Sequence, residues 1–359
     1  MSLHPALEQA DVLIELKRYD EAAALLGRRL AEDPEDIRAW VTLGRCQVAA
    51  GRVEQALESL GEALQRAPED IGALCMQAQA LRRADHLEQP ERWRKAEASL
   101  RQALRVDPHN SFAHALLAEF LMYYPTRRLE ALDLAKEAVR LDPESVDAYQ
   151  ALWRTAGAIP ETETYKWALR QVLRLEPTNN QALYLVSMQE AHKPGTTAAQ
   201  AAAVYADALA AAPDNTGLRH DLDRATYRLL RGIRWLALIC VAAAGAMVDL
   251  FPQDGEVARD LPVPLGNRLW VLVPMTAVWG FGAWRRYRRL RTGVQLNVWS
   301  LVRRGRWARV VLAQAAWAML CALLISQVPW TERTVPQTLF WAGLAPTLAT
   351  VWFDRKKTR

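Results

Sequence analysis

The chain has 359 residues, with 45 Lys and Arg, 40 Asp and Glu, and a formal net charge of +5. The charge is uneven: residues 228–359 hold 19 basic and 6 acidic residues, and the residues before them are acidic overall. A nucleic-acid-binding module carries a basic stripe on its folded domain. Here the excess of basic residues accompanies hydrophobic segments, so nucleic acid binding is not predicted.

Six prolines divide the first two-thirds of the chain at nearly equal intervals. They are Pro34, Pro68, Pro108, Pro143, Pro177 and Pro213, at intervals of 34, 40, 35, 34 and 36 residues. A period close to 34 residues is typical of a helical repeat array, in which each repeat contributes a helix pair. Because proline ends a helix, each of these prolines is expected to follow the second helix of its repeat.

Small and apolar residues recur twelve, eight and five residues before most of these prolines. This spacing puts them on one helical face, where small side chains let two helices approach closely. The clearest segment runs Trp40-x-x-Leu43-Gly44 … Ala56 … Leu60 … Ala63 … Pro68. Over residues 3–215 the chain therefore resembles the tetratricopeptide repeat (TPR) family. The resemblance implies antiparallel helix pairs stacked into a right-handed superhelix.

Six repeats are expected, at 3–36, 37–70, 71–110, 111–145, 146–179 and 180–215. The amphipathic segment 215–231 is expected to close the array as a capping helix, since solenoids need a polar outer face at their ends. The predicted solenoid domain thus covers residues 1–231. An unrelated helical bundle is the alternative for this region.

The resemblance also implies that the first helix of each repeat lines a concave binding groove. By position, the expected groove residues are Arg38, Val41, Arg45, Cys75, Gln79, Arg82, Arg83, Glu119, Tyr123, Gln150, Arg154, Tyr184 and Met188. Arginine presents forked donors to carboxylates, and Tyr and Met offer adaptable contact area. These residue types favour a partner segment with an acidic end and apolar anchors, although a solvated surface explains any single arginine equally well.

Residues 232–359 have a different composition and are expected to form a membrane domain. They hold 10 of the 14 tryptophans. Four stretches with few charges predict transmembrane spans at about 233–251, 268–285, 310–331 and 335–353, because a membrane helix needs about 20 apolar residues. For the first of these spans, a buried soluble helix is the alternative.

Basic residues between the second and third spans set the expected topology. Segment 285–309 has nine arginines and no acidic residue, and such segments stay in the cytoplasm. Four spans with both termini in the cytoplasm satisfy every loop, and the Ala/Arg-rich composition favours a bacterial inner membrane. Stretch 292–309 is either a helix on the membrane surface or an ordinary basic loop. The residues expected at the membrane surface are Arg285, Arg286, Arg288, Arg289, Arg303, Arg304 and Arg306.

Signatures of catalysis and of metal binding do not occur in the sequence. It has no Cys-x-x-Cys pair, glycine-rich phosphate loop or Gly-x-Ser-x-Gly elbow, which are the patterns that carry such chemistry. The predicted spans contain no ionisable residue in their interiors, and Gln314 is their most polar buried candidate. Because ion-coupled transporters need ionisable groups there, such a transporter is not favoured. The lack of catalytic and metal-binding motifs predicts no enzyme activity, cofactor or metal.

These patterns predict an all-α protein in which a TPR-like solenoid is followed by a four-helix transmembrane region. The expected function is a membrane-anchored scaffold that binds a protein or peptide in its groove and localises it at the cytoplasmic face. Membrane lipid is a second expected partner, and small-residue runs in the spans suggest homo-oligomers. The alternatives are a membrane enzyme or transporter subunit with a regulatory TPR region, and a soluble protein with a hydrophobic oligomerisation domain.

Overall fold

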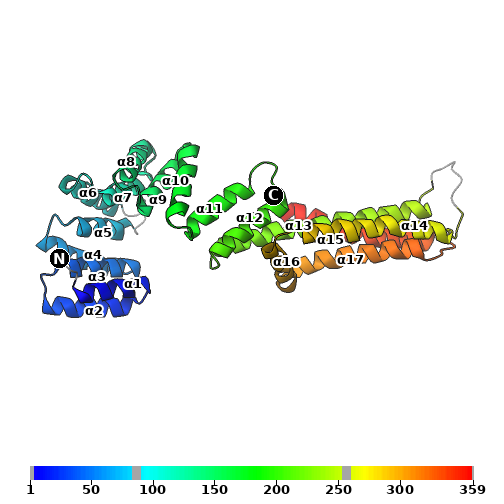
Figure 1. The fold of residues 1–359 in the computed structure, drawn as a ribbon, viewed down its shortest axis with the longest axis horizontal. Coiled ribbons are helices and arrows are strands. Elements are labelled where there is room, and N and C mark those ends of the chain that lie inside the picture. The colour runs from blue at the N-terminus through cyan, green and yellow to red at the C-terminus, as the bar shows by residue number, and fades with distance from the viewer. Residues whose placement is uncertain (1–3, 83–89, 253–259, 358–359) are drawn as a thin grey trace. The chain divides into compact units, whose positions relative to one another are not determined.

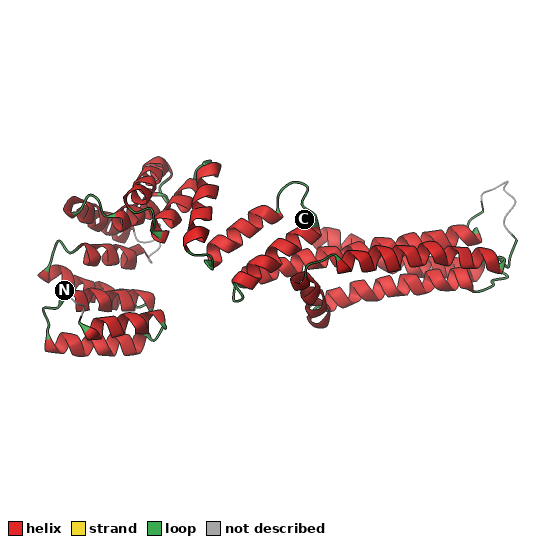
Figure 2. Ribbon diagram, in the orientation of Figure 1, coloured by secondary structure: helices red, strands yellow, loops and turns green. Residues whose placement is uncertain are grey.

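The computed structural model describes residues 4–82, 90–252 and 260–357, and every element in these ranges is helical (Figure 1 and Figure 2). The all-α prediction is therefore confirmed for the described residues. Contacts divide the chain into two units, Met1–Ala182 and Leu183–Arg359. Each unit contains hydrophobic clusters of its own.

The first unit is a succession of helix pairs, and each of the first five expected repeats contains one pair. The helices are α1 (Pro5–Glu15), α2 (Tyr19–Glu32), α3 (Ile37–Ala49), α4 (Val53–Arg66), α5 (Ile71–Arg82), α6 (Pro90–Val106), α7 (Ser111–Leu121), α8 (Arg128–Leu141), α9 (Val146–Gly157) and α10 (Thr162–Leu175), with a short 3₁₀ turn, η1 (Pro125–Arg127), before α8. Each first helix also contacts the next first helix, from α1 to α3 and on to α9. This stacking is the solenoid that the proline period predicts.

Polar residues after the repeat prolines start the first helices. Asp36 accepts a hydrogen bond from the backbone N–H of Ala39 at 3.0 Å, and Asp70 accepts one from Ala73 at 2.8 Å. Such side-chain caps satisfy N–H groups that have no partner inside the helix. Asp36 and Asp70, two residues after their repeat prolines, are thus explained by helix initiation.

The small residues of the repeat pattern lie where adjacent helices meet. The side chains of Ala56, Leu60 and Ala63 are completely buried. At Gly44, an added Cβ would lie 2.5 Å from Cγ of Leu60, which is far inside van der Waals contact. Glycine is therefore required at this crossing of α3 and α4.

The second unit contains the end of the repeat region and a bundle of longer helices. Its elements are α11 (Asn180–Ala191), which begins just before the unit boundary, α12 (Ala198–Ala211), α13 (Thr216–Val248), α14 (Leu265–Thr276), the π-helix η2 (Ala277–Ala283), α15 (Trp284–Arg288), α16 (Thr292–Arg304), α17 (Arg306–Gln327) and α18 (Thr334–Lys357). Helices α13, α17 and α18 contact one another, and α14 packs on α13 and α17 (Figure 1).

The expected domain boundary at 231/232 falls inside helix α13, which runs unbroken for 33 residues. Its first half packs on α12 through Leu222 and Ala225, and its second half buries Ala237 and Cys240 in the bundle core. No proline interrupts the junction, so the predicted capping helix continues into the predicted first span. Contacts divide the chain at 182/183 instead, and the division into domains 1–231 and 232–359 stays a prediction.

Four transmembrane helices are not confirmed. Among the described helices, α13 and α17 are long and apolar enough to cross a membrane. The expected span 268–285 coincides with α14, η2 and α15, where Pro274 and the π-helix leave only short α-helical segments. The expected span 335–353 lies within α18, whose prolines, tryptophans and polar residues lower its mean hydropathy.

Small residues in the bundle serve contacts within the chain. A Cβ at Gly245 would lie 3.1 Å from the ring of Phe340, and one at Gly343 would lie 3.1 Å from Cβ of Cys321. Ala244, in the same run as Gly245, is fully buried. These runs therefore join α13, α17 and α18 to one another, and they give no separate argument for a homo-oligomer.

Candidate functional site

A cavity of about 160 Å³ opens between the first helices α5, α7 and α9 of the first unit. Its lining residues are Gln79, Arg82, Phe112, Ala115, Leu116, Glu119, Asp147, Gln150 and Arg154. On each helix most of these residues are spaced by three, four or seven positions, which puts them on one helical face. The cavity thus lies on the side where the resemblance places the binding groove.

Glu119 is the electrostatic centre of this cavity. Arg154 Nη1 donates to Glu119 Oε1 at 2.5 Å, and Arg82 Nη1 donates to Oε2 of the same carboxylate. The Glu119 side chain is only 10% exposed, whereas those of Arg82 and Arg154 are 33% and 29% exposed. Two guanidinium groups from neighbouring repeats therefore share one buried carboxylate.

Asp147 is the second carboxylate of the cavity, in the first turn of α9. Within the described part of the chain, its carboxylate accepts no hydrogen bond. The pKa of Asp147 is raised, because the surrounding walls desolvate it and because Glu119 and Glu176 lie nearby, while Arg154 opposes the shift. The residue remains open to solvent, since a concave wall can surround a group without covering it.

The structure brings five of the expected groove residues together in this cavity: Gln79, Arg82, Glu119, Gln150 and Arg154. Others in the first unit lie elsewhere. Arg38 is exposed, Val41 is half-buried, and Arg45 forms an ion pair with Asp11 of α1. Cys75 is buried in the core and does not line the groove.

The remaining expected groove residues do not join this cavity. Tyr123 packs edge-on against Trp93, with ring centroids 5.3 Å apart. Tyr184 and Met188 belong to the second unit, and Arg83 lies outside the described residues. The groove was expected along all the first helices. In the first unit, five of its expected residues line one cavity on three helices, α5, α7 and α9.

Phe112, Ala115, Leu116 and Asp147 line the cavity but were not among the expected groove residues. A helical-face argument identifies two of them. Phe112 lies seven residues before Glu119, and Asp147 lies seven residues before Arg154, so each shares a face with an expected residue. Extending the expected positions by two turns would have found both.

A cluster of exposed arginines lies at one end of the helical bundle: Arg285, Arg286, Arg288, Arg289, Arg303, Arg304 and Arg306. Two of them cover aromatic rings, with Arg285 4.8 Å from the ring centre of Phe281 and Arg288 4.7 Å from that of Trp284. Segment 292–304 is a helix, α16, as one of the two interpretations of this stretch predicted.

Helix α16 has two different faces. Val294 and Asn297 are buried, and the Asn297 side chain donates to Asp223 at 3.0 Å and to Thr226 at 3.1 Å. Leu296 and Trp299 are exposed on the other face. The helix is thus fixed to α13 through polar contacts and leaves apolar side chains uncovered.

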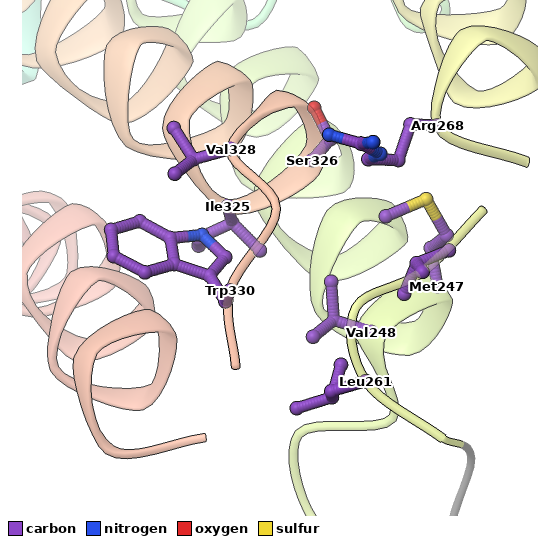
Figure 3. A pocket seen from close by; sticks show the side chains of 9 residues that line it. Met247, Val248, Leu261, Arg268, Ile325, Ser326, Val328 and Trp330 are labelled. Atoms are coloured by element: carbon purple, nitrogen blue, oxygen red, sulfur yellow. The ribbon is translucent and has the colours of Figure 1, made fainter. Parts of the chain in front are cut away.

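At the opposite end of the bundle, side chains donate hydrogen bonds to backbone carbonyls. Arg268 Nη1 donates to the carbonyl of Gln327 at 2.9 Å, and Gln327 Nε2 donates back to the carbonyl of Arg268 at 3.0 Å. Arg333 and Gln337 donate to the carbonyls of Asp249 and Leu250 at the end of α13. Figure 3 shows a gap at this end that has no room for a water molecule, lined by Met247, Val248, Leu261, Val263, Arg268, Ile325, Ser326, Val328 and Trp330.

Gln314 has a structural role. Its Nε2 donates to the carbonyl of Pro346 at 3.3 Å, and its Oε1 accepts from Thr350 at 3.1 Å. Both partners lie in α18, so the amide joins α17 to α18. This explains the most polar residue of the expected spans without transport or catalysis.

Known proteins resemble the repeat region. Residues 20–124 match the TPR domain of the cytochrome c-type biogenesis protein H family. A TPR repeat-containing protein of Pseudomonas aeruginosa is 28% identical over 183 residues, which are 50% of this chain and 30% of that protein. Human tetratricopeptide repeat protein 21B is 38% identical over 86 residues, which are 23% of this chain and 6% of that protein. The chain therefore spans less than a third of either relative.

Two solved structures are similar to part of this chain. The Cut9–Hcn1 hetero-tetramer of the APC/C has a TM-score of 0.50 and 14% identity, covering 61% of this chain and 42% of the other. A TPR protein of Thermus thermophilus has a TM-score of 0.45 and 25% identity, covering 49% of this chain and 93% of the other. The proline period, the stacked helix pairs and the match of residues 20–124 to a TPR family model together show that the first part of the chain is a tetratricopeptide repeat segment.

Proposed function

We propose that this chain is a membrane-anchored TPR scaffold, which binds a protein or peptide in the cavity of its first unit and holds it at the cytoplasmic membrane face. The membrane-anchoring part of this proposal rests on the apolar surface of the helical bundle. Its exposed residues include Trp235, Ile239, Leu265, Leu269, Trp270, Val273, Phe281, Trp284, Trp307, Trp317, Leu320, Trp341 and Leu348. Soluble monomers rarely expose apolar patches larger than a few hundred Å².

The order of residues along the bundle fits a bilayer. Trp284 and Trp307 lie at the arginine-rich end, and Trp270 and Phe251 lie toward the opposite end. Tryptophan is enriched at membrane interfaces. Helix α17 runs from Arg306 to Gln327, and a rise of about 1.5 Å per residue makes it about as long as the hydrocarbon core is thick.

We extend the proposal to four membrane segments: the second half of α13, α14 to α15, α17, and α18. These segments run between the same two ends of the bundle. At one end, Arg268 of α14 donates to the carbonyl of Gln327 of α17, and Gln337 of α18 donates to the carbonyl of Leu250, which follows α13. Proline and non-α helical backbone occur in membrane helices where neighbours satisfy the freed polar groups. In α18, Trp317 of α17 donates to the carbonyl of Ala342, four residues before Pro346.

The exposed arginine cluster supports an orientation. Arginine-rich segments stay in the cytoplasm, so we place this end of the bundle and both termini on that side, in a bacterial inner membrane. Helix α16 then lies at the cytoplasmic interface, with Leu296 and Trp299 toward the acyl boundary and Arg303 toward lipid phosphates. Amphipathic helices bind membranes in this way.

The cavity between α5, α7 and α9 supports the binding part. Solenoids use their concave face as an extended binding surface, and this cavity combines an apolar wall with amides and charges. The match of residues 20–124 to a TPR domain is consistent with a protein-binding role. Holding a partner at the membrane raises its effective concentration there without catalysis.

Carbonate extraction of membranes from cells that produce the full chain tests the anchoring. Retention in the membrane pellet supports the proposal, whereas release into the supernatant contradicts it and favours a soluble protein whose apolar bundle is covered by a second copy. A photo-crosslinking amino acid at Gln150 tests the binding, with Asp133 on α8 as the control position. A discrete crosslinked protein from Gln150 only is expected, and equal crosslinking from both positions would exclude the cavity as the binding site.

A further inference from the structure

The cavity between α5, α7 and α9 has a chemical preference that its residues determine. We propose that it takes a lysine or arginine side chain of the partner segment, with the Asp147 carboxylate as the counter-ion. This inference rests on the proposed binding function of the same cavity. It names the charge of the partner group, which is opposite to the acidic end that the arginines of the sequence suggested.

The two arginines that line the cavity are already engaged, because Arg82 and Arg154 both donate to Glu119. An incoming carboxylate would have to compete with Glu119, whose side chain is nearly buried and therefore held close to both guanidinium groups. Charge-assisted pairs of this kind are among the stronger hydrogen bonds in proteins.

Asp147 is the charged group of the cavity that lacks a hydrogen-bonded partner among the described residues. The two arginines, Glu119 and Asp147 sum to no net charge, so a bound cation would meet an unpaired carboxylate without an excess of positive charge. Desolvation is the largest cause of the raised pKa of Asp147, followed by the nearby carboxylates of Glu119 and Glu176. These neighbours make the position more favourable to a cation.

Asp147 is not the capping residue of α9, although an acidic residue in the first turn is favoured by the helix dipole. The acidic residues that recur with the repeat are the capping residues Asp36 and Asp70, whereas in α9 the cap is Ser145. Asp147 stands two residues after the cap. The equivalent residues in the other first helices of this unit are Ala6, Arg38, Gly72 and Phe112, so an acidic residue is not a requirement of the position.

The size and walls of the cavity fit a long basic side chain. Its volume of about 160 Å³ is well above the roughly 10–15 Å³ of such space that one water molecule needs. The side chains of Phe112 and Leu116 form an apolar wall along which the methylene stem of lysine or arginine can pack. The amides of Gln79 and Gln150 can pair with the backbone of the same partner segment.

Selection from a random peptide display library, with the detergent-solubilised full chain as the target, tests this inference. We expect enrichment of Lys or Arg at one position of the selected peptides. For a selected peptide, Asp147→Asn should weaken binding about tenfold, as the loss of a charge-assisted hydrogen bond does. Asp133→Asn removes the same charge from an exposed position on α8 and should leave binding unchanged.

The outcomes separate the inference from the proposed function. Peptides that lose binding in a Gln79→Ala/Gln150→Ala variant, but show Asp or Glu enrichment or no charged preference, would overturn the basic-group inference and leave the groove function intact. Selected peptides whose binding is unaffected by that variant would contradict the groove itself. Lysine enrichment that is equally reduced by Asp147→Asn and Asp133→Asn would also overturn the inference, because general charge attraction would explain it.

Discussion

The indole Nε1 of Trp317 donates a hydrogen bond of 3.0 Å to the carbonyl of Ala342. Pro346 stands four residues after Ala342 and has no N–H, so this carbonyl has no ordinary partner within α18. Trp317 of α17 replaces the missing donor. In a hydrocarbon environment an unsatisfied backbone group is costly, so this contact explains how a proline is accommodated in a proposed membrane helix.

Replacing Trp317 by Phe should destabilise the bundle by about 1 kcal/mol, because it keeps an aromatic ring and removes the donor. Trp270→Phe is the control, since Trp270 is 73% exposed. Thermal unfolding of the full chain in detergent, followed by circular dichroism, measures the difference. Equal shifts in the two variants would show that the Ala342 carbonyl does not depend on Trp317.

Two glycines in the same repeat should respond to alanine in opposite ways. A Cβ at Gly44 would lie 2.5 Å from Leu60 Cγ, whereas one at Gly61 would meet nothing within 4 Å. Gly44→Ala should therefore destabilise the first unit by about 1–3 kcal/mol through overpacking. Gly61→Ala should stabilise it by about 0.5–1 kcal/mol through helix propensity. Urea midpoints of the two variants check the sign, and a stabilising Gly44→Ala would contradict the close packing.

Glu119→Gln should weaken the first unit by about 1–3 kcal/mol, because it leaves Arg82 and Arg154 facing each other without the carboxylate that joins them. The control is Glu54→Gln, which removes a carboxylate that is 69% exposed and paired with Arg92. Exposed pairs contribute little. Urea denaturation of both variants gives the comparison, and similar losses would mean that the Glu119 pairs are no stronger than surface pairs.

Glu130 should make the first unit sensitive to acid. Hydrogen bonds from Arg127 and Arg101, with their positive charges, lower its pKa below the ordinary 4.5. A lowered folded pKa contributes stability that is present above the unfolded value and is lost as the pH falls through the folded value. Glu130→Gln should therefore reduce the loss of stability below pH 4.5. The control Glu58→Gln changes an exposed residue, and acid titrations that are identical to wild type for both variants would contradict the assignment.

The four cysteines should react slowly with a thiol reagent in the folded protein. Cys46, Cys75, Cys240 and Cys321 are all buried. Burial also raises the pKa of Cys75 to about 12, so its reactive thiolate is scarce at neutral pH. Labelling with a maleimide should be complete only after denaturation. Rapid labelling of the native chain, located by peptide mass spectrometry, would identify a helix pair that opens.

The repeat helices could be predicted from the sequence because their signals are local. Proline, the capping residues Asp36 and Asp70, and the small residues at fixed offsets all act within one repeat. The end of the solenoid could not be predicted, because the sequence of α13 changes from amphipathic to apolar without a residue that would end the helix. Of the four expected spans, 268–285 is divided into short helical segments, and 335–353 lies in a helix that is less apolar than α13 and α17.

Part of the lining of the cavity could be predicted from the sequence, but the pairing of its charged residues could not. The expected groove positions included Arg82, Glu119 and Arg154, but the sequence did not show that these three pair with one another. The pairs join residues that are 37 and 35 positions apart, which is about one repeat. Residues one repeat apart meet on adjacent first helices, so this interval is the signal to use in other arrays.

Tryptophan quenching by lipids brominated in their acyl chains tests the membrane location most directly. Ten of the 14 tryptophans lie in residues 228–359, and four, Trp40, Trp93, Trp153 and Trp167, lie in the first unit. In vesicles of brominated lipid, most of the emission of the full chain should disappear, and the remainder should come from those four. Emission that is the same in brominated and ordinary lipid would contradict insertion of the bundle.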